Sequence, residues 1–584
     1  MYSFSLTVPI PLPLGLELRN GIISCVVLGI LILLVSHLPK GALGDYSNLL
    51  AMLLLFGAPL SALWTSGISE PSVIGGLLPN ADARQYLQGA MNLSAGSTLT
   101  PGSSERPLFP ALLGFLLTIT QHNLKISLSV LVAVNALACY SLSRELRFSH
   151  GVVAAISIAL ITFLFYRRFS GTFLTENLGF ALGVIALALF FRAINRQSVH
   201  LFAIGLLSLA LALSARAGAF FVLPILLFWG INFFTKAFGR NQTLIILFSA
   251  IGLALILSVI TASVVRPAGF SPPSGFGHTL YGQVVGGKGW TQIGVDHPEA
   301  SSEDYFQLAF EEFRSNPIRL LIGVKSAYLD YFNWDHGAFG YGFISNDDTD
   351  HSHLLFRRIL YLLGIGGFLL CCFQYREPQN LFLVIFKLGI LGSVPFIPPI
   401  DADGMRVYAA TMPCNAIFPA LAISALVSLT RDTVLKAPST SSTSAFIATP
   451  KLDLLIPLCI ILVLASTLFP IALKYLGISI NPSSYECELF PHTLDSPASS
   501  KGVIFLAPDQ PNSRTLSPYV IIKDFKSGLS GLDQYPKLRK ALEALPEYSI
   551  IAFDFLNGYS FCAFKNGQHL RSHPDPKPLS RQSH

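Results

Sequence analysis

The chain has 584 residues, of which 52% are hydrophobic and only 12% are charged, and its mean hydropathy is +0.56. A soluble protein normally carries about 25% charged residues. This composition excludes a disordered chain, a fibrous repeat and a disulfide-rich secreted module. The formal net charge of +6 is spread over the ends of apolar segments, so it gives no evidence for a nucleic-acid partner. We therefore expect a multi-pass integral membrane protein.

Apolar segments long enough to cross a hydrocarbon core of about 30 Å as helices recur along the sequence. We expect spanning helices at about 21–38, 48–65, 124–143, 150–167, 173–193, 199–214, 219–234, 243–264, 358–374, 380–397, 407–429 and 453–474. The stretch 107–120 is apolar but short, which predicts a re-entrant or interfacial helix. The expected fold class is therefore an all-α polytopic membrane protein with about 12 transmembrane helices and one such short helix.

Lysines and arginines in the short connections predict the orientation. They recur at alternate connections, for example at Arg144, Arg192 and Arg376, so we place these connections in the cytoplasm. Residues 66–123, the loop 265–357 and everything after 475 then face the extracytoplasmic side. Arg167 and Arg168 also fall on that side and break the rule. We expect a transmembrane domain at 1–475, which includes structured outer loops 66–123 and 265–357.

The long loop and the tail each show patterns of ordered structure. Ser301 and the acidic residues after it precede an amphipathic helical pattern, and Pro317 begins a second helix that extends to about Phe332. In the tail, 502–507, 519–522 and 549–555 read as strands, with a helical pattern at 535–545 between them. The segment 476–584 is thus predicted to be a small extracytoplasmic α/β domain.

Asp82 follows the second apolar segment, within Asn80-Ala81-Asp82-Ala83-Arg84-Gln85-Tyr86. A carboxylate at this position can accept a proton from an attacking hydroxyl or hold a divalent cation. The alternative is a solvated aspartate that pairs with Arg84 or caps the following helix.

Other ionisable residues are predicted on the same side of the membrane. Arg106 precedes the short apolar stretch in Glu105-Arg106-Pro107-Leu108-Phe109-Pro110, Glu176 begins one spanning helix, and Arg216 ends another. Ionisable groups at a membrane boundary are costly unless they are paired or functional. Arginine offers forked donors to phosphate oxygens, so this group predicts a pocket for a lipid-linked phosphate. For each arginine the alternative is snorkelling to lipid headgroups.

The long loop has a second set of candidate binding residues, Tyr281, Lys288, Trp290 and His297, interleaved with glycines. Glycines let a backbone approach a ligand closely, and an aromatic face suits a sugar ring. The alternative is a tight loop whose aromatic side chains rest at the membrane interface.

Asp403 and Arg406 lie between the tenth and eleventh predicted spans, where Arg406 can meet a donor phosphate. Asp403 is a further candidate for substrate binding, and the alternative is that it simply neutralises Arg406. Histidines and aspartates at 335–353 match no zinc spacing, so we expect no metal there. The sequence names no cofactor, although a divalent cation stays open as an alternative.

Three short motifs resemble those of the GT-C superfamily, both in their residues and in their order along the chain. They are Asp82 with Tyr86, the Arg-Pro-Leu-Phe-Pro stretch 106–110, and the Thr175-Glu176 pair. These are integral-membrane glycosyltransferases that use polyprenyl-phosphate sugars, and the branch resembled is the protein O-mannosyltransferase and aminoarabinose-transferase type. The resemblance covers roughly 48–430. This branch usually has a carboxylate pair at the acidic motif, whereas Ala81 and Ala83 flank Asp82 here, which favours a single base over a bidentate metal site.

The resemblance implies that Asp82 deprotonates an acceptor hydroxyl, which attacks the anomeric carbon with inversion and expels polyprenyl phosphate. A phosphate leaving group needs positive charge as its bond breaks, for which Arg216, Arg406 and Lys288 are candidates, with Arg106 behind them. The expected partners are a polyprenyl-phosphate sugar donor, a hydroxyl acceptor on a lipid, polysaccharide or protein, and membrane lipid. The expected location is the plasma (inner) membrane, with the active site facing the extracytoplasmic side.

Two other functions are compatible with the composition. A transporter or flippase of a lipid-linked saccharide would show inverted repeats and charges near the bilayer midplane. We find no clear repeat, and the ionisable residues gather at one face. A non-catalytic assembly factor would carry its function in the tail, yet many of the outer-face charges precede residue 430.

Overall fold

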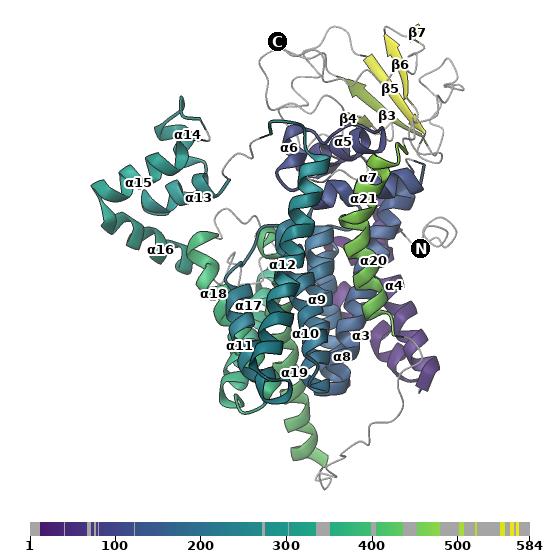
Figure 1. Cartoon of the computed structure of the whole chain (residues 1–584). Helices are drawn as coiled ribbons and strands as arrows, with labels where there is room; N and C mark the ends of the chain where they lie inside the picture. The colour runs from purple at the N-terminus through teal and green to yellow at the C-terminus, as the bar shows by residue number, and fades with distance from the viewer. Residues whose placement is uncertain are drawn as a thin grey trace.

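A computed structural model gives the architecture of the chain (Figure 1). The structure describes residues 12–39, 41–66, 70, 72–74, 78–79, 81–121, 123–270, 275–301, 303–333, 351–398, 405–435, 453–478, 501–506, 520–522, 549–554, 561–565 and 568–570. Long helices packed side by side form one bundle, and the shorter helices lie at one end of it or project from its flank.

The bundle contains most of the predicted apolar segments. Its helices are α2 (Leu12–Asn20), α3 (Ile23–His37), α4 (Gly41–Ser66), α8 (Leu124–Tyr166), α9 (Glu176–Arg196), α10 (Val199–Ala215), α11 (Val222–Phe238), α12 (Arg240–Val265), α17 (His351–Phe373), α18 (Pro378–Ser393), α19 (Met412–Leu435), α20 (Leu455–Ser466) and α21 (Leu468–Tyr475). Each of the twelve predicted segments overlaps at least one of these helices, and the last of them, 453–474, covers both α20 and α21. The prediction of a helical, membrane-type protein is therefore confirmed.

Among the described residues, the number of candidate membrane spans is lower than the twelve predicted. Within the described ranges, seven helices are long and apolar enough to cross a membrane, or up to nine if each of two bent helix pairs is one span. Helix α8 is bent back at Gly151, where φ is 86°, and Ser143 Oγ donates to the carbonyl of Ala155 at 2.8 Å. Those residues would lie about 18 Å apart in a straight helix. Helix α8 therefore contains both predicted segments 124–143 and 150–167, while twelve spans stays a prediction.

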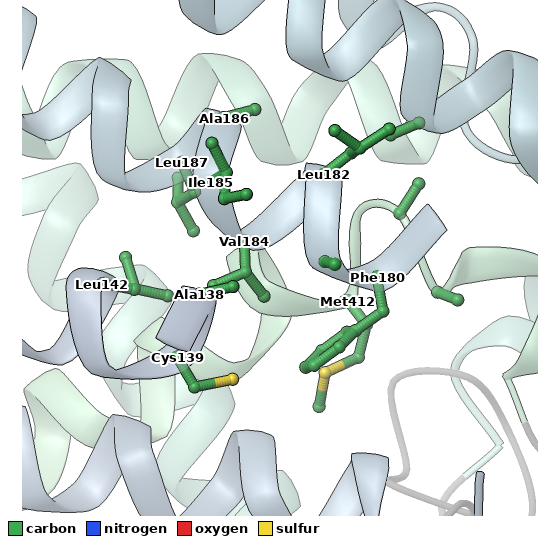
Figure 2. Close-up of a cluster of buried hydrophobic side chains, with 14 of the residues drawn as sticks. Ala138, Cys139, Leu142, Phe180, Leu182, Val184, Ile185, Ala186, Leu187 and Met412 are labelled. Atoms are coloured by element: carbon green, nitrogen blue, oxygen red, sulfur yellow. The ribbon is translucent and has the colours of Figure 1, made fainter. Parts of the chain in front are cut away.

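Helix α9 lies at the centre of the bundle. All of its residues from Glu176 to Ile194 are buried, and it packs against α8, α10, α18, α19 and α20. Figure 2 shows part of this core, where Ala138, Cys139 and Leu142 of α8 face α9 close to Met412 of α19. Close van der Waals packing of this kind holds membrane helices together, because lipid tails are as apolar as the side chains. Helix α9 is thus a rigid base for the residues at its two ends.

Short elements cover the end of the bundle at which α9 begins, which we call the α5 end. They are the strands β1 (Val73–Ile74) and β2 (Leu78–Pro79), and the helices α5 (Asp82–Ser94), α6 (Pro101–Ser104) and α7 (Leu108–Ile119). Helix α7 is the predicted short apolar helix, and nearly all of its residues are buried against α5, α8, α20 and α21. It is therefore packed against other helices of the protein, and its re-entrant or interfacial position stays a prediction.

The long loop forms a helical subdomain, as predicted. It contains α13 (Gly275–Val284), α14 (Gln292–Asp296), α15 (Tyr305–Ser315) and α16 (Pro317–Tyr331). Tyr281, Val284, Ile293 and Ala309 form its small apolar core. Figure 1 shows this loop subdomain projecting from the bundle beside α18. The two helices predicted after Ser301 and at Pro317 correspond to α15 and α16.

Two buried arginines join the N-terminal helices to the bundle. Arg167 is 3% exposed and donates to the carbonyls of Leu18, at 3.2 Å, and Gly21. Arg19 is equally buried and pairs with Glu70 at 2.5 Å. Buried carbonyls at the 103° bend between α2 and α3 need such donors. This structural role accounts for Arg167 on the side where the predicted orientation does not expect an arginine.

The opposite end of the bundle has its own buried ion pairs. Arg192 of α9 donates to Glu145 of α8 at 2.5 Å and to Asp453, just before α20, at 2.7 Å. Arg192 and Glu145 are nearly fully buried, so each needs the other's charge. This group ties α8, α9 and α20 together far from the α5 end.

The tail contains a five-stranded antiparallel sheet in the order β4-β3-β5-β6-β7. Its strands are β3 (Lys501–Leu506), β4 (Val520–Ile522), β5 (Ser549–Asp554), β6 (Phe561–Lys565) and β7 (Gln568–Leu570). The first three match the predicted strands, and the sequence reading missed the last two. The helix predicted at 535–545 lies outside the described residues, so the α/β domain stays a prediction.

Candidate functional site

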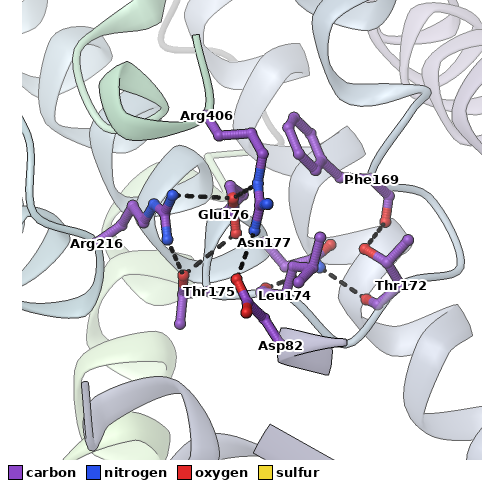
Figure 3. Close-up of polar contacts among 9 residues, drawn as sticks. All are labelled: Asp82, Phe169, Thr172, Leu174, Thr175, Glu176, Asn177, Arg216 and Arg406. Atoms are coloured by element: carbon purple, nitrogen blue, oxygen red, sulfur yellow. Dashed lines mark hydrogen bonds and ion pairs between the residues drawn. The ribbon is translucent and has the colours of Figure 1, made fainter. Parts of the chain in front are cut away.

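Asp82 and Arg406 meet at the α5 end (Figure 3), although 324 positions separate them. Asp82 is the first residue of α5, and Arg406 begins a short 3-10 helix, η4 (Arg406–Tyr408), which precedes α19. Arg406 Nη2 lies 3.2 Å from Asp82 Oδ2, and the Asp82 side chain remains 52% exposed. The aspartate is thus fixed by an arginine on one side and open to solvent on the other.

Glu176 joins this pair to a second arginine. Its Oε1 lies 2.5 Å from Arg406 Nε and 3.5 Å from Arg216 Nη2, and its side chain is fully buried. Thr175 Oγ1 donates to Glu176 Oε2 at 3.2 Å and accepts from Arg216 Nη1 at 3.5 Å. The buried carboxylate therefore holds two guanidinium groups side by side. Arg216 Nε is buried without a hydrogen-bond partner among the described residues, which is an unusual cost for a charged group.

A tight turn before α9 positions Glu176. The Asn177 side chain donates to the carbonyls of Thr172, at 2.9 Å, and Leu174, at 3.1 Å, and it accepts from the Tyr166 hydroxyl at 2.8 Å. Asn135 of α8 donates to the Asn177 carbonyl at 3.1 Å. These bonds satisfy the backbone where α9 begins, so the position of Glu176 is fixed by the helices around it.

Two glycines of α9 allow the arginine-bearing segments to approach Glu176. Gly179 and Gly183 lie three and seven residues after Glu176, so all three share one face of α9. A Cβ atom at Gly179 would stand 2.9 Å from Arg216 Cβ, and one at Gly183 would stand 2.0 Å from the Ala410 carbonyl oxygen. Only glycine lets these two backbones approach so closely.

Three more ionisable side chains surround this group. Burial raises the pKa of Tyr86 and keeps its phenol neutral, while the charges of Arg106 and Arg216 oppose that shift. Burial also raises the pKa of Glu105, opposed by Arg106 and assisted by Asp82. Arg106 makes no hydrogen bond or ion pair with the residues that the structure describes. The predicted Arg106 thus lies within electrostatic range of Tyr86, Glu105 and Arg216.

A pocket of about 700 Å³ adjoins this group on the side of α12. Glu105, Ser214, Arg266 and Lys474 contribute its polar wall, and Val259, Ala262 and Phe270 contribute apolar surface. Val259 is 67% exposed, like many α12 side chains, so this wall borders the lipid-facing surface of the bundle. Arg266 Nε donates to the Ser104 carbonyl at 2.8 Å and Lys474 Nζ to the Val264 carbonyl at 2.6 Å. Neither cation is paired with a carboxylate in the part of the chain that the structure describes.

The structure separates the predicted site residues into two groups. Asp82, Glu176, Arg216 and Arg406 contact one another as described, with Arg106 nearby. Tyr281, Lys288, Trp290 and His297 all belong to the loop subdomain, which projects away from α5 and α6 (Figure 1). Asp403 lies outside the described residues.

The loop residues mainly support one another. The Tyr281 hydroxyl donates to Asp296 Oδ2 at 3.1 Å, and the Tyr281 and His297 rings lie 5.5 Å apart. Trp290 packs edge-on against His278 at 5.8 Å and is 50% exposed, and Lys288 is also exposed. This arrangement agrees with the alternative of a tight loop, and direct sugar binding by these residues stays a prediction.

Sequence reasoning missed three cations. Arg266 and Lys474 end apolar helices, a position that usually indicates lipid snorkelling, so only the folded pocket distinguishes them. Lys387 is buried inside α18, where its Nζ contacts Tyr331 at 2.8 Å and Asn415 at 2.7 Å. A lysine inside an apolar helix indicates a paired or functional group, so the sequence alone could have identified Lys387. The expectation that the ionisable residues gather at one face is therefore incomplete.

The described residues do not form a metal site. Among them, no three His, Cys, Asp or Glu side chains lie close enough together to hold an ion. Asp82 and Glu176 already pair with arginines, whose charge would repel a metal ion. The histidine and aspartate run at 335–350 lies outside the described residues.

Comparisons with known proteins give little further guidance. No model of a known protein family matches the sequence, and no curated protein does. Two crystal structures of the Archaeoglobus fulgidus oligosaccharyltransferase are similar to the structure of this chain. In one the enzyme is tethered to an acceptor peptide containing the NVT sequon, and the TM-score is 0.39. In the other it is in complex with Zn and sulfate, and the TM-score is 0.38. Both are 14% identical to this chain, and the similarity covers 75% and 74% of it. It covers only 56% and 53% of the oligosaccharyltransferase chains, about half their length, and at these TM-scores it does not decide function.

Proposed function

We propose that this protein is a membrane glycosyltransferase that moves a sugar from a polyprenyl-phosphate donor to a hydroxyl acceptor, in the manner of the GT-C enzymes that its sequence resembles. The observation that carries the proposal is the exposed Asp82 carboxylate held against Arg406, beside a lipid-bordered pocket with two unpaired cations. The site would face the extracytoplasmic side of the plasma membrane.

Asp82 is the residue suited to activate the acceptor. Its Oδ2 pairs with Arg406, while Oδ1 has no hydrogen-bond partner among the residues of known placement. A hydroxyl that reaches Oδ1 can pass its proton to the carboxylate as its oxygen attacks the anomeric carbon. Glu176 is fully buried, so its role is to hold Arg216 and Arg406 in place.

The pocket beside α12 suits the donor phosphate. The guanidinium of Arg266 and the ammonium of Lys474 are anchored by one backbone bond each, and their remaining N–H groups can bind phosphate oxygens. The polyprenyl chain would then leave along the exposed apolar surface of α12. Glu105 connects the pocket to the base, because its side chain lines the pocket and the charge of Asp82 contributes to its raised pKa. Positive charge along this wall would stabilise the departing polyprenyl phosphate.

The proposal is tested by sugar transfer in membranes that contain the wild type or Asp82→Asn. A panel of labelled polyprenyl-phosphate sugars is supplied, and product is followed in the lipid, protein and polysaccharide fractions. We expect transfer by the wild type and a loss of at least about 100-fold in the variant, because the substitution keeps the size of the side chain and removes the base. Binding of the donor should persist.

Asp45→Asn is the matched control, because Asp45 lies near the start of α4, outside the α5-end group. It should transfer like the wild type. Transfer that persists in Asp82→Asn would reject Asp82 as the base. Saccharide that crosses the membrane without any transfer would establish the transporter in place of the enzyme.

A further inference from the structure

We propose that α16 lies in the membrane, with its exposed apolar side chains covered by lipid of the leaflet at the α5 end. Side chains on one stripe of this helix are exposed and apolar. Their exposed fractions are 66% for Ile318, 68% for Leu321, 53% for Ile322 and 62% for Leu329. Their spacing of i, i+3, i+4 and i+11 places them on one face along almost the whole helix.

The opposite face of α16 is already occupied by protein. Gly323, Ala327 and Tyr331 recur every four residues and are buried. A Cβ atom at Gly323 would stand 2.3 Å from the Gln283 carbonyl oxygen, so α13 packs directly on this face. The packing of the loop subdomain is therefore complete without the apolar stripe, which must be covered by something outside the described residues.

The end of α16 lies at the depth of the spanning helices. The Tyr328 hydroxyl donates to the Leu391 carbonyl at 3.1 Å, and the Tyr331 hydroxyl accepts from Lys387 Nζ at 2.8 Å. Lys387 precedes the end of α18 at Ser393 by six residues, or about 9 Å of helix. The Phe332 carbonyl accepts from Tyr361, which lies within the apolar helix α17. Helix α16 thus descends beside two candidate membrane spans.

The two helices that the end of α16 contacts, α17 and α18, also expose apolar side chains. Leu355, Ile359 and Leu362 of α17 and Leu388 of α18 are between 45% and 62% exposed. Lys325 lies within the stripe, and a lysine on an apolar face at a membrane boundary can extend its amine to the headgroups. Exposed apolar side chains on two candidate spans and on the helix that contacts both of them fit one bilayer better than a protein partner.

This placement gives the loop subdomain a supporting function that does not require it to bind the sugar. The ring of Tyr331, at the end of α16, lies 5.8 Å from that of Tyr408, two residues after Arg406. A helix fixed in the leaflet would therefore support the segment that carries Arg406.

The test is a nitroxide spin label at Leu321→Cys, in full-length protein in phospholipid nanodiscs, with Cys372, Cys487 and Cys562 replaced by serine. Collisions with O2, which is concentrated in lipid, are compared with those with the water-soluble complex Ni-EDDA. Arg319→Cys is the matched control, because Arg319 lies on the same helix outside the stripe and its side chain is 49% exposed.

We expect the label at 321 to be mobile, to collide with O2 and to lose the Ni-EDDA collisions that the label at 319 shows. A label at 321 that meets Ni-EDDA as readily as the control would place the stripe in water. An immobile label that meets neither reagent would place it against protein. Either of these two results overturns the proposal, and neither depends on whether the protein transfers sugar.

Discussion

Asp82 and Arg406 form an ion pair at 3.2 Å, and each of them follows a non-glycine residue with a positive φ. Ala81 has φ 51° and ψ −128°, and Met405 has φ 69°. Such conformations cost about 1–3 kcal/mol each and persist only where the surroundings impose them. Two such residues directly before the two members of one ion pair indicate that the fold maintains this geometry against local backbone preference.

Ala81→Gly should therefore stabilise the protein while it weakens transfer. Glycine adopts this φ without strain, and after its extra entropy in the unfolded chain is counted, we expect a gain of about 1 kcal/mol in the free energy of unfolding. Asp82 would be held less firmly, so transfer should fall about two- to tenfold. Gln197→Gly is the control, since Gln197 has φ 49° at the opposite end of α9. It should not reduce transfer, and an equal loss in both variants would refute the link to Asp82.

Glu176→Gln should destabilise the protein by about 3–5 kcal/mol, because it leaves Arg216 and Arg406 without their shared buried carboxylate. Glu145→Gln removes one of the two carboxylate partners of Arg192 at the opposite end and should also destabilise the protein, but by less, because Arg192 keeps Asp453. The two variants differ in function: transfer per folded molecule should fall only in Glu176→Gln. Thermal unfolding in detergent measures the first effect and an assay on the folded fraction measures the second. Equal activity would make Glu176 purely structural.

The sequence predicted the helical class, the short helix α7, both long helices of the loop and three tail strands, because apolar periodicity and breaker residues decide these locally. It also singled out Asp82, Glu176, Arg216 and Arg406, which the structure brings into mutual contact, because all four are charged residues at helix ends on the same predicted side; their roles in transfer stay predictions. It did not predict which arginines would share Glu176, since that depends on contacts across 230 positions. Lys288 and Trp290 show a different limit of sequence reasoning, because glycines and aromatic residues give the same pattern in a packed loop as in a binding loop; sugar binding by these two residues stays a prediction.

Gly183→Ala should separate α9 from the segment that carries Arg406. Its Cβ would stand 2.0 Å from the Ala410 carbonyl oxygen, which is backbone and cannot rotate away. We expect a displacement of the 406–410 segment, a loss of about 1–3 kcal/mol in stability and a loss of about 100-fold in transfer. Gly252→Ala in α12 meets nothing within 4 Å and should leave transfer unchanged. Wild-type transfer by Gly183→Ala would mean that the Glu176–Arg406 contact is dispensable.

Arg266→Gln and Lys474→Gln should each raise the KM for the polyprenyl-phosphate donor about tenfold or more, because each removes a charged hydrogen bond to phosphate. The rate at saturating donor should fall as well, because the same positive charges would stabilise the departing polyprenyl phosphate. Lys236→Gln at the opposite end is the control for a general effect of charge on lipid binding. If all three variants shift KM equally, the pocket beside α12 does not bind the donor phosphate.

Donor binding should strengthen as the pH falls, because of Glu105. Burial raises the pKa of this carboxyl above its ordinary value, so it takes up a proton at a higher pH than a free glutamate does. At neutral pH its negative charge repels a phosphodiester in the pocket, and protonation removes that repulsion. The phosphodiester does not change its own charge in this range. We expect an affinity gain of about two- to fivefold between pH 7.5 and pH 5, measured with a non-transferable polyprenyl phosphodiester in nanodiscs.

Glu105→Gln should bind the phosphodiester tightly at both pH values. Glu299 is an exposed acid of the loop subdomain, so Glu299→Gln should keep the wild-type pH dependence. A pH dependence that survives in Glu105→Gln would assign it to another group and remove Glu105 from the donor pocket.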